Sequence, residues 1–314
     1  MLKKILIVIV LIPLLLFFYA IGRKDLTLPK ATVKAKYSLA NSHFINWKGG
    51  EFHYTESGSG VPVLMIHGFG GSNRDFYILD SLVNSKYRVI RVDLPGFGLS
   101  DFPEQNEGDE KITEVYSEYF SFLLDTLHID SCYVLGNSLG GLMSVNLTLQ
   151  HPDLVKKLIL FNSAGYDMAE VMKTANASFF QGKLVQLMLE KGIPKYMTAK
   201  GIGRVFYKAP LLTEEKIQRV NDFWNREGNL HHIMAMASTK EQFDESLIKK
   251  ISCPTLIVWG KEDKIVNPKY AERFHHDIKG SQVIIYDSCG HVPMMERPLD
   301  VQREVLRFLS NTTN

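Results

Sequence analysis

The chain of 314 residues predicts an α/β protein in which a mostly parallel sheet is covered by helices on both faces. Short apolar runs, such as 63–66 and 254–259, alternate with longer segments of helical periodicity, and this alternation is typical of parallel sheets. The same runs are apolar at nearly every position, as expected for strands buried on both faces. Near the chain start, the alternating runs 44–47 and 51–56 predict an antiparallel hairpin at one sheet edge.

The remaining elements follow one another in a regular order. Strands after the hairpin are expected at 63–66, 87–92, 132–135, 157–161, 254–259 and 282–286, which gives a sheet of eight strands. Helices are expected at 75–84, 112–127, 139–150, 268–277 and 298–310. We therefore assign residues 44–163 and 251–314 to one α/β core.

Residues 164–250 interrupt this alternation because they contain helical patches and no clear strand. Thr213 is expected to cap a helix that begins with Glu214 and Glu215. Six of the eleven methionines fall between positions 168 and 236. We predict a helical cap inserted between strands 6 and 7, where methionine and aromatic side chains would give a ligand an adaptable apolar wall.

Composition excludes several classes of partner. The 36 basic residues nearly balance the 34 acidic residues, so the net charge is only +2 and nucleic acid is not an expected partner. Cys132, Cys253 and Cys289 lack the spacing of a metal site and cannot all pair in disulfides. No metal is expected.

The N-terminus carries an apolar segment. Residues 5–22 contain no charged side chain and would span roughly 27 Å as a helix, close to the thickness of a bilayer core. Phe18 lies three positions before a possible cleavage after Ala20, where a signal peptide needs a small residue, so an uncleaved anchor at 1–23 is favoured over secretion after cleavage. Lys3 and Lys4 would then stay in the cytoplasm, with the catalytic domain on the extracytoplasmic side. Residues 24–43 are expected to be a tether.

The most informative stretch is the turn at 136–140, which reads Gly-Asn-Ser-Leu-Gly between an expected strand and an expected helix. This pattern predicts a nucleophile elbow, in which a strained turn raises the Ser138 hydroxyl above the edge of the sheet. The glycines at 136 and 140 permit a turn too tight for side chains. Ser138 would also lie at a helix N-terminus, which favours a developing anion.

A serine nucleophile needs a base, and the base needs an orienting acid. His291 follows the last expected strand and Asp263 follows the strand before it, so both would meet Ser138 at the carboxyl edge of the sheet. The order Ser, Asp, His is the order expected for such a sheet. Two alternatives for the acid stay open, the adjacent Glu262 and Asp167 after the earlier strand.

A glycine-rich loop, His67-Gly-Phe-Gly-Gly71, follows the strand at 63–66. It would allow the backbone N–H of Phe69 to face the same point as the N–H of Leu139, forming an oxyanion hole. Gly68 and Gly70 supply the flexibility of this loop, and His67 is expected to brace it rather than to transfer protons. Asp93 is expected to order its own Pro-Gly loop.

With these motifs, the chain resembles the α/β-hydrolase superfamily in its lidded serine esterase and lipase branch, over about residues 44–310. The matching segments lie at 67–70, 93–100, 136–141, 259–263 and 290–291. The resemblance implies the α/β-hydrolase fold, with Ser138 as nucleophile, His291 as base, Asp263 as acid and no cofactor. A chain with an N-terminal anchor and this cap is similar to membrane-anchored bacterial lipases and to monoacylglycerol lipases.

Serine at the elbow favours acyl transfer to water, whereas aspartate there would favour an epoxide hydrolase or a dehalogenase. We therefore expect a serine hydrolase that cleaves lipid-like or acylglycerol esters through an acyl-enzyme at a membrane surface. One alternative is a carbon–carbon bond hydrolase of dienoate ring-cleavage products, whose elbows can also read Gly-Asn-Ser-x-Gly-Gly. Another is a non-catalytic binding protein on the same fold, which the complete set of site residues disfavours.

Overall fold

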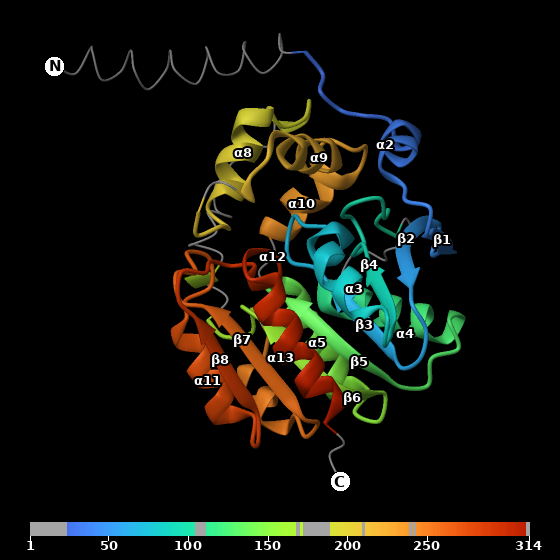
Figure 1. The fold of residues 1–314 in the computed structure, drawn as a ribbon. Coiled ribbons are helices and arrows are strands. Elements are labelled where there is room, and N and C mark those ends of the chain that lie inside the picture. Colours follow the sequence, from blue (N-terminus) through green and yellow to red (C-terminus); the bar gives the residue numbers. More distant parts are fainter. Residues whose placement is uncertain are drawn as a thin grey trace, which may run out of the picture.

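The computed structural model describes residues 24–103, 111–167, 170–171, 189–208, 211–238, 241 and 243–311. Within them lies one eight-stranded sheet of order β1-β2-β4-β3-β5-β6-β7-β8 (Figure 1). The strands are β1 (Ser42–Trp47), β2 (Gly50–Ser57), β3 (Pro62–Ile66), β4 (Arg88–Val92), β5 (Cys132–Asn137), β6 (Val155–Phe161), β7 (Thr255–Gly260) and β8 (Gln282–Tyr286). The predicted fold class is confirmed.

The sheet is parallel from β4 to β8 and antiparallel only at the edge formed by β1 and β2. The hairpin β1–β2 pairs Trp47 with Gly50, and β2 then adds to β4 in antiparallel register. Because β3 to β8 run in one direction, the loops after these strands open at the same edge. This edge positions the candidate site.

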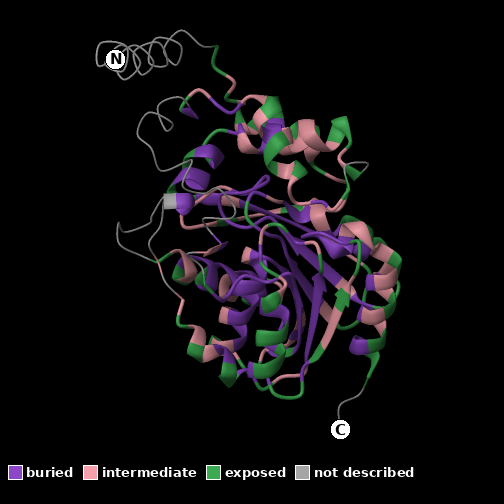
Figure 2. Cartoon of the chain, turned by 90° about the vertical axis from the view of Figure 1, so that its left-hand side faces the viewer, coloured by how far each residue is buried: buried purple, intermediate pink, exposed green. Residues whose placement is uncertain are grey.

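Helices cover both faces of the sheet. One face carries the 3-10 turn η1 (Asn73–Phe76), α3 (Tyr77–Val83), α12 (Pro293–Glu296) and α13 (Pro298–Ser310). The other face carries α4 (Ile112–Thr126), α5 (Leu139–Gln150) and α11 (Lys269–Asp277). Figure 2 shows the strands in the middle of the sheet as mostly buried, which fits the apolar sequences of β3 to β7.

Four helical segments lie between β6 and β7 and make up the described part of the cap: α8 (Lys195–Gly203), α9 (Glu214–Trp224), α10 (Asn229–Ser238) and the 3-10 segment η4 (Glu245–Lys250). Helices α8, α9 and α10 stand over one end of the sheet (Figure 1). Thr213 caps α9 as predicted, since its Oγ1 accepts a hydrogen bond from the Lys216 N–H at 3.2 Å. Residues 172–188 of the expected cap lie outside the described residues.

The expected tether at 24–43 is instead largely structured. It contains α2 (Lys30–Tyr37), which packs Val33 against Phe223 of the cap and Leu99 of the core. Lys36 Nζ and Tyr37 Oη each lie 2.7 Å from Asp222 Oδ2 on α9. A mostly polar sequence gave no sign of this helix because its single buried residue, Val33, depends on tertiary packing.

The expected anchor at 1–23 lies outside the described residues. Among the residues that the structure does describe, no helix is both long and apolar enough to cross a bilayer.

Candidate active site

Ser138 occupies a strained turn between β5 and α5. Its backbone has φ 53° and ψ −118°, a conformation that costs a non-glycine residue about 1–3 kcal/mol. A Cβ at Gly136 would collide with the carbonyl of Gly140, and one at Gly140 would collide with the carbonyl of Ile66. The predicted elbow geometry is therefore present, with Ser138 at the N-terminal end of a helix.

The structure brings His291 and Asp263 together. His291 Nδ1 lies 2.7 Å from Asp263 Oδ2, and both side chains are buried. Asp263 Oδ1 accepts the N–H groups of Ile265 at 2.7 Å and Val266 at 3.1 Å, while Asn162 Nδ2 donates to Oδ2 at 2.7 Å. Because the carboxylate accepts the Nδ1 proton, Nε2 of His291 is the nitrogen left to act as a base.

The two alternative acids lie elsewhere. Glu262 accepts the N–H of Cys289 at 2.9 Å, and Asp167 accepts the N–H of Glu170 at 3.1 Å in an exposed turn. Of the three candidates, only Asp263 has a hydrogen bond to the His291 ring in the described structure.

The glycine-rich loop lies directly against the nucleophile. A Cβ at Gly68 would be 3.1 Å from Ser138 Cβ. Gly71 N–H donates to the Gly68 carbonyl at 3.1 Å, which closes a turn whose third residue, Gly70, has φ 70°. His67 braces this turn, because its Nδ1 donates to the Gly68 carbonyl at 2.7 Å while its Nε2 accepts the Leu94 N–H at 3.0 Å.

Phe69 and Leu139, the predicted oxyanion donors, lie in this loop and at the start of α5. Within the described residues, neither backbone N–H donates a hydrogen bond to another protein atom. Free N–H groups are normal in the first turn of a helix, and they are what an oxyanion would need. The Phe69 side chain is 38% exposed and packs edge-on against Phe97.

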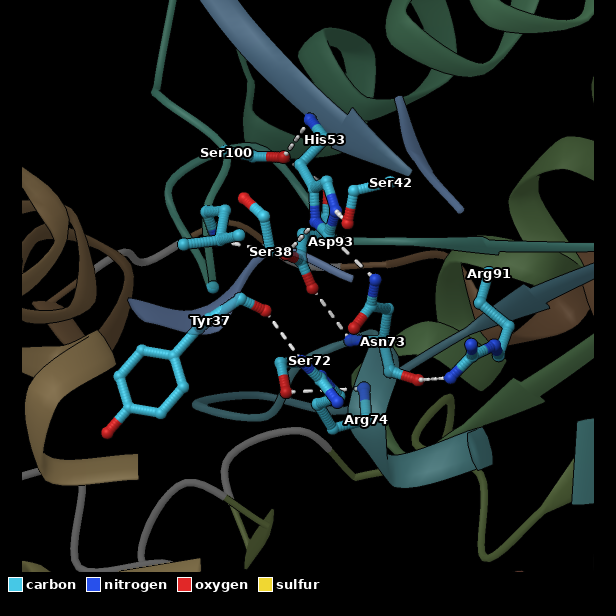
Figure 3. Close-up of polar contacts among 12 residues, drawn as sticks. Tyr37, Ser38, Ser42, His53, Ser72, Asn73, Arg74, Arg91, Asp93 and Ser100 are labelled. Atoms are coloured by element: carbon cyan, nitrogen blue, oxygen red, sulfur yellow. Dashed lines mark hydrogen bonds and ion pairs between the residues drawn. The ribbon is translucent and has the colours of Figure 1, made fainter. Parts of the chain in front are cut away.

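A buried polar network supports the chain that follows this loop (Figure 3). His53 Nδ1 lies 2.7 Å from Asp93 Oδ2, and the Asn73 N–H donates to Asp93 Oδ1 at 2.7 Å. Leu99 N–H also donates to Asp93 Oδ2, at 2.9 Å, so Asp93 does order its own Pro-Gly loop. Burial favours a higher pKa for Asp93, but its interactions with His53 and His67 and the hydrogen bond from the Asn73 N–H together outweigh burial, and the pKa is lowered. Ser42, on β1, completes the network with its Oγ 2.8 Å from His53 Nε2.

Two asparagines near the site have structural roles that were not predicted from the sequence. Asn137 Nδ2 donates to the carbonyls of Phe161 at 3.0 Å and His291 at 3.1 Å, which joins the elbow to the histidine loop. Asn162 directly follows β6 and binds Asp263. The rule that residues after parallel strands meet at one edge could have identified Asn162, although no motif marks it.

The cap contacts the loop that follows β8 and carries His291, the histidine loop. The His291 N–H donates to the Val205 carbonyl at 2.8 Å, and Glu296 accepts the N–H groups of Gly290 and Tyr207, both at 2.8 Å. Burial raises the pKa of Glu296. The carboxylate thus joins the histidine loop to the segment after α8.

Helix α9 contributes positive charge beside the glycine-rich loop. Asp75 lies under this loop, where a Cβ at Gly71 would strike its carboxylate. Burial raises the pKa of Asp75, and the positive charges of Arg219 and Lys216 partly oppose that rise. Arg219 and Lys216 thus act electrostatically on the carboxyl group beneath the oxyanion loop. In the described part of the chain, no cluster of three His, Cys, Asp or Glu side chains is arranged to bind a metal.

Comparisons with known proteins identify the family. The alpha/beta hydrolase fold family matches residues 61–298. The 2-hydroxy-6-oxononadienedioate/2-hydroxy-6-oxononatrienedioate hydrolase of Cupriavidus pinatubonensis is 30% identical over 90% of this chain and 100% of its own.

Two solved structures share the fold. A meta-cleavage product hydrolase from Pseudomonas fluorescens is 22% identical, with a TM-score of 0.75, and the match covers 86% of this chain and 98% of the other. A bacterial membrane phospholipase A is also 22% identical, with a TM-score of 0.72, over 98% of this chain and 94% of its own. At these identities the two structures establish the fold alone.

These findings correct two predictions. The expected ester or lipase activity is contradicted, since the relative that matches along 90% of the chain is named as a hydrolase of a ring-cleavage product. The same comparison contradicts the predicted location, in which a lipase domain is anchored to a membrane or secreted. The lipase branch is thus not supported, whereas the superfamily is: the chain is a hydrolase that belongs to the alpha/beta hydrolase fold family.

Proposed function

We propose that this protein hydrolyses a carbon–carbon bond of a dienoate ring-cleavage product, with Ser138 as nucleophile, His291 as base and Asp263 as orienting acid. The observation that carries this proposal is the 30% identity, over 90% of the chain, to a hydrolase named for 2-hydroxy-6-oxononadienedioate. The hydrogen bond of 2.7 Å between His291 Nδ1 and Asp263 Oδ2 supports the assignment of base and acid.

The same side chains can cleave an ester or a carbon–carbon bond beside a ketone, because both reactions begin with addition to a carbonyl. Ser138 Oγ attacks the ketone carbon while its proton moves to His291 Nε2. The carbonyl electron pair becomes an oxyanion, which the N–H groups of Phe69 and Leu139 stabilise.

Collapse of this tetrahedral intermediate re-forms the carbonyl and breaks the carbon–carbon bond. The 2-hydroxyl proton of the dienol must first move to carbon 5, which gives a 2,6-dioxo-3-ene whose carbon 5 is saturated. The electron pair of the broken bond then moves to carbon 5, where conjugation with the 2-oxo group delocalises it, and the His291 imidazolium supplies the proton. A water molecule then gives a proton to His291 and attacks the acyl group on Ser138, which releases an acid and restores the serine.

Charge near the site favours an acidic substrate. Lys216 and Arg219 on α9 act on Asp75 under the oxyanion loop, where their positive charges oppose the effect of burial on its pKa. The compound that the relative is named for hydrolysing, 2-hydroxy-6-oxononadienedioate, is a dicarboxylate, and carboxylates pair well with such side chains. A neutral acylglycerol would make no use of these charges.

The test is to follow the loss of colour of a 2-hydroxy-6-oxo-dienoate with the purified protein. We expect turnover by the wild type and a fall in kcat of roughly 10⁴-fold or more in Ser138→Ala. Asp263→Asn should lower kcat by about 10³–10⁴-fold because the imidazole loses its orienting carboxylate. Asp167→Asn should leave kcat unchanged, and exposed Ser81→Ala is the matched serine control.

Two outcomes would contradict the proposal. One is turnover of p-nitrophenyl esters by the wild type with no consumption of the dienoate. The other is dienoate turnover that survives Ser138→Ala.

A further inference from the structure

The geometry points to Trp224 as a positioning residue that holds the oxyanion hole in its working shape from the cap. The Trp224 Nε1–H donates a hydrogen bond to the Gly70 carbonyl at 2.7 Å. This inference rests on the proposed function, because it concerns the same oxyanion hole, and it assigns a part in the reaction to α9.

Two peptide groups connect the indole to the expected oxyanion donor. The Gly70 carbonyl that accepts from Trp224 shares a peptide plane with the Gly71 N–H. That N–H donates to the Gly68 carbonyl at 3.1 Å, and the Gly68 carbonyl shares a plane with the N–H of Phe69. In a trans peptide the carbonyl and the N–H point in opposite directions, so fixing each carbonyl also fixes the N–H beyond it.

The loop needs this support because glycine dominates it. Gly68, Gly70 and Gly71 populate backbone conformations freely, so a rigid arrangement must come from their hydrogen bonds. His67 Nδ1 holds the Gly68 carbonyl from within the core, and Trp224 holds the Gly70 carbonyl from the cap. The polar network around Asp93 fixes the chain just beyond the loop, at Asn73 (Figure 3).

Trp224 is itself well placed to impose a shape. It is the last residue of α9, and its ring packs so closely on the loop that a Cβ at Gly70 would lie 3.0 Å from its Cζ2 atom. The neighbouring Phe223 is buried against Val33, and the side chain of Asn225 donates to the Ile193 carbonyl at 2.9 Å. The indole is therefore anchored on both sides in the chain.

A tryptophan in a cap could also act only as an apolar wall for the substrate. The two roles can be separated at one group, the indole Nε1–H, which only the positioning role requires. Replacement of Trp224 by benzothienylalanine, which puts sulfur in place of N–H, keeps the wall and removes the donor. We expect kcat to fall about tenfold with KM nearly unchanged, a smaller loss than the 10²–10³-fold of removing an oxyanion donor outright. Trp224→Phe should lower kcat in the same direction, and the same two changes at Trp47 on β1 are the matched controls.

A second readout does not depend on the substrate. When a fluorophosphonate reacts with a serine, an O–P bond forms, the P–F bond breaks and fluoride leaves, while the phosphoryl oxygen takes the place of the oxyanion. The labelling rate at Ser138 should therefore fall by the same factor as kcat. Wild-type kcat and labelling rate in the benzothienylalanine protein would overturn the inference. A rise in KM that accounts for the whole loss of kcat/KM would also overturn it, and would show that Trp224 acts only as an apolar wall for the substrate.

Failure of the proposed function would look different. If the wild type does not consume the dienoate but labelling at Ser138 slows in the Trp224 variants, the substrate assignment fails and the positioning role stands. If the dienoate is consumed and Ser138→Ala abolishes this, while the Trp224 variants match the wild type in both readouts, only the positioning role fails.

Discussion

The carboxylate of Asp263 shows how a single residue can keep a negative charge inside the protein. Its two oxygens accept three N–H groups in addition to the His291 ring, from Ile265, Val266 and the side chain of Asn162. Each charge-assisted bond offsets part of the cost of removing the carboxylate from water. The ring of His291 is therefore held by a group that is itself fixed.

His232 on α10 shows the opposite arrangement, a titratable side chain kept neutral. Its ring stacks on Phe102 with centroids 4.1 Å apart, and its Nε2 lies 3.2 Å from the Tyr116 hydroxyl. Burial is the main reason that its pKa is lowered to about 3, and the nearby His231 adds to the effect.

A pH dependence of stability follows from this residue. Below the ordinary histidine pKa of about 6.5, the unfolded chain binds a proton at His232, whereas the folded protein does not. The contribution of neutral His232 to the free energy of unfolding is therefore fully present above that pH and is lost as the pH falls toward 3. Between about pH 6.5 and pH 5, His232 should account for a loss of roughly 1.5–2 kcal/mol in the free energy of unfolding. Urea unfolding of the wild type and His232→Gln at the two pH values measures this loss, because the variant cannot titrate there.

The neighbouring His231 is exposed and gives the matched control, His231→Gln. The control should keep the pH dependence of the wild type. An equally steep dependence in His232→Gln would show that other groups cause it.

At the scale of elements, the loop after β8 depends on a contact with the cap. Glu296 on α12 uses one oxygen for the Gly290 N–H and the other for the Tyr207 N–H. Each of these bonds involves a charged acceptor, so the two bonds offset part of the effect of burial, which still raises the pKa of Glu296. The carboxylate suits this position because both of its oxygens accept.

Glu296→Gln should therefore weaken the join between cap and core. An amide has one acceptor, so its NH₂ group would face a second N–H, and we expect a loss of about 1–3 kcal/mol in the free energy of unfolding. Denaturant unfolding gives this value, and a fall in kcat would report disorder in the His291 loop. Exposed Glu272→Gln on α11 is the control. A stability equal to that of the wild type would mean that loss of the buried charge compensates fully for the lost bond.

At the scale of the whole molecule, the segment at 24–41 connects cap and core. Val33 on α2 is 1% exposed and touches both Leu99 and Phe223. On the core side, Arg74 donates to the Tyr37 carbonyl at 2.6 Å, and the Leu39 N–H donates to Ser42 Oγ at 2.8 Å.

Truncation of this contact should loosen the cap. Val33→Ala removes two methyl groups from a closed apolar cluster, which we expect to cost about 1–3 kcal/mol. Limited proteolysis should then cut the cap sooner than in the wild type, and the exposed Val61→Ala is the control. An unchanged cleavage rate in the cap would show that α2 does not hold it.

Most of the sheet could be predicted from sequence, because buried parallel strands are apolar throughout and are separated by periodic helices. The hydrogen bond between His291 and Asp263, and the bond from Asn137 of the elbow to the His291 carbonyl, followed from the single edge at which parallel strands end. Helix α2 and the bond from Trp224 to Gly70 could not be predicted, since both depend on contacts between distant segments and leave no local pattern.

The substrate was wrongly predicted for a chemical reason. A serine, a histidine, a carboxylate and two N–H donors serve ester cleavage and carbon–carbon cleavage equally, because both begin by adding a hydroxyl to a carbonyl. The apolar run at 5–22 then weighted the choice toward lipids. Evidence against that choice came from similarity along 90% of the chain and not from the reacting residues.

The cap touches the two reactive loops at separate points. The Val205 carbonyl accepts a hydrogen bond from the histidine loop, and the Trp224 indole donates one to the glycine-rich loop. Segments inserted between two strands are convenient units for recombination, because the sheet closes without them. Here a transplanted insert would bring a new substrate wall and, with it, new hydrogen-bond partners for the groups that carry out the reaction. Selectivity and turnover would thus be inherited together, and a chimera would have to restore both contacts before its new preference could be expressed.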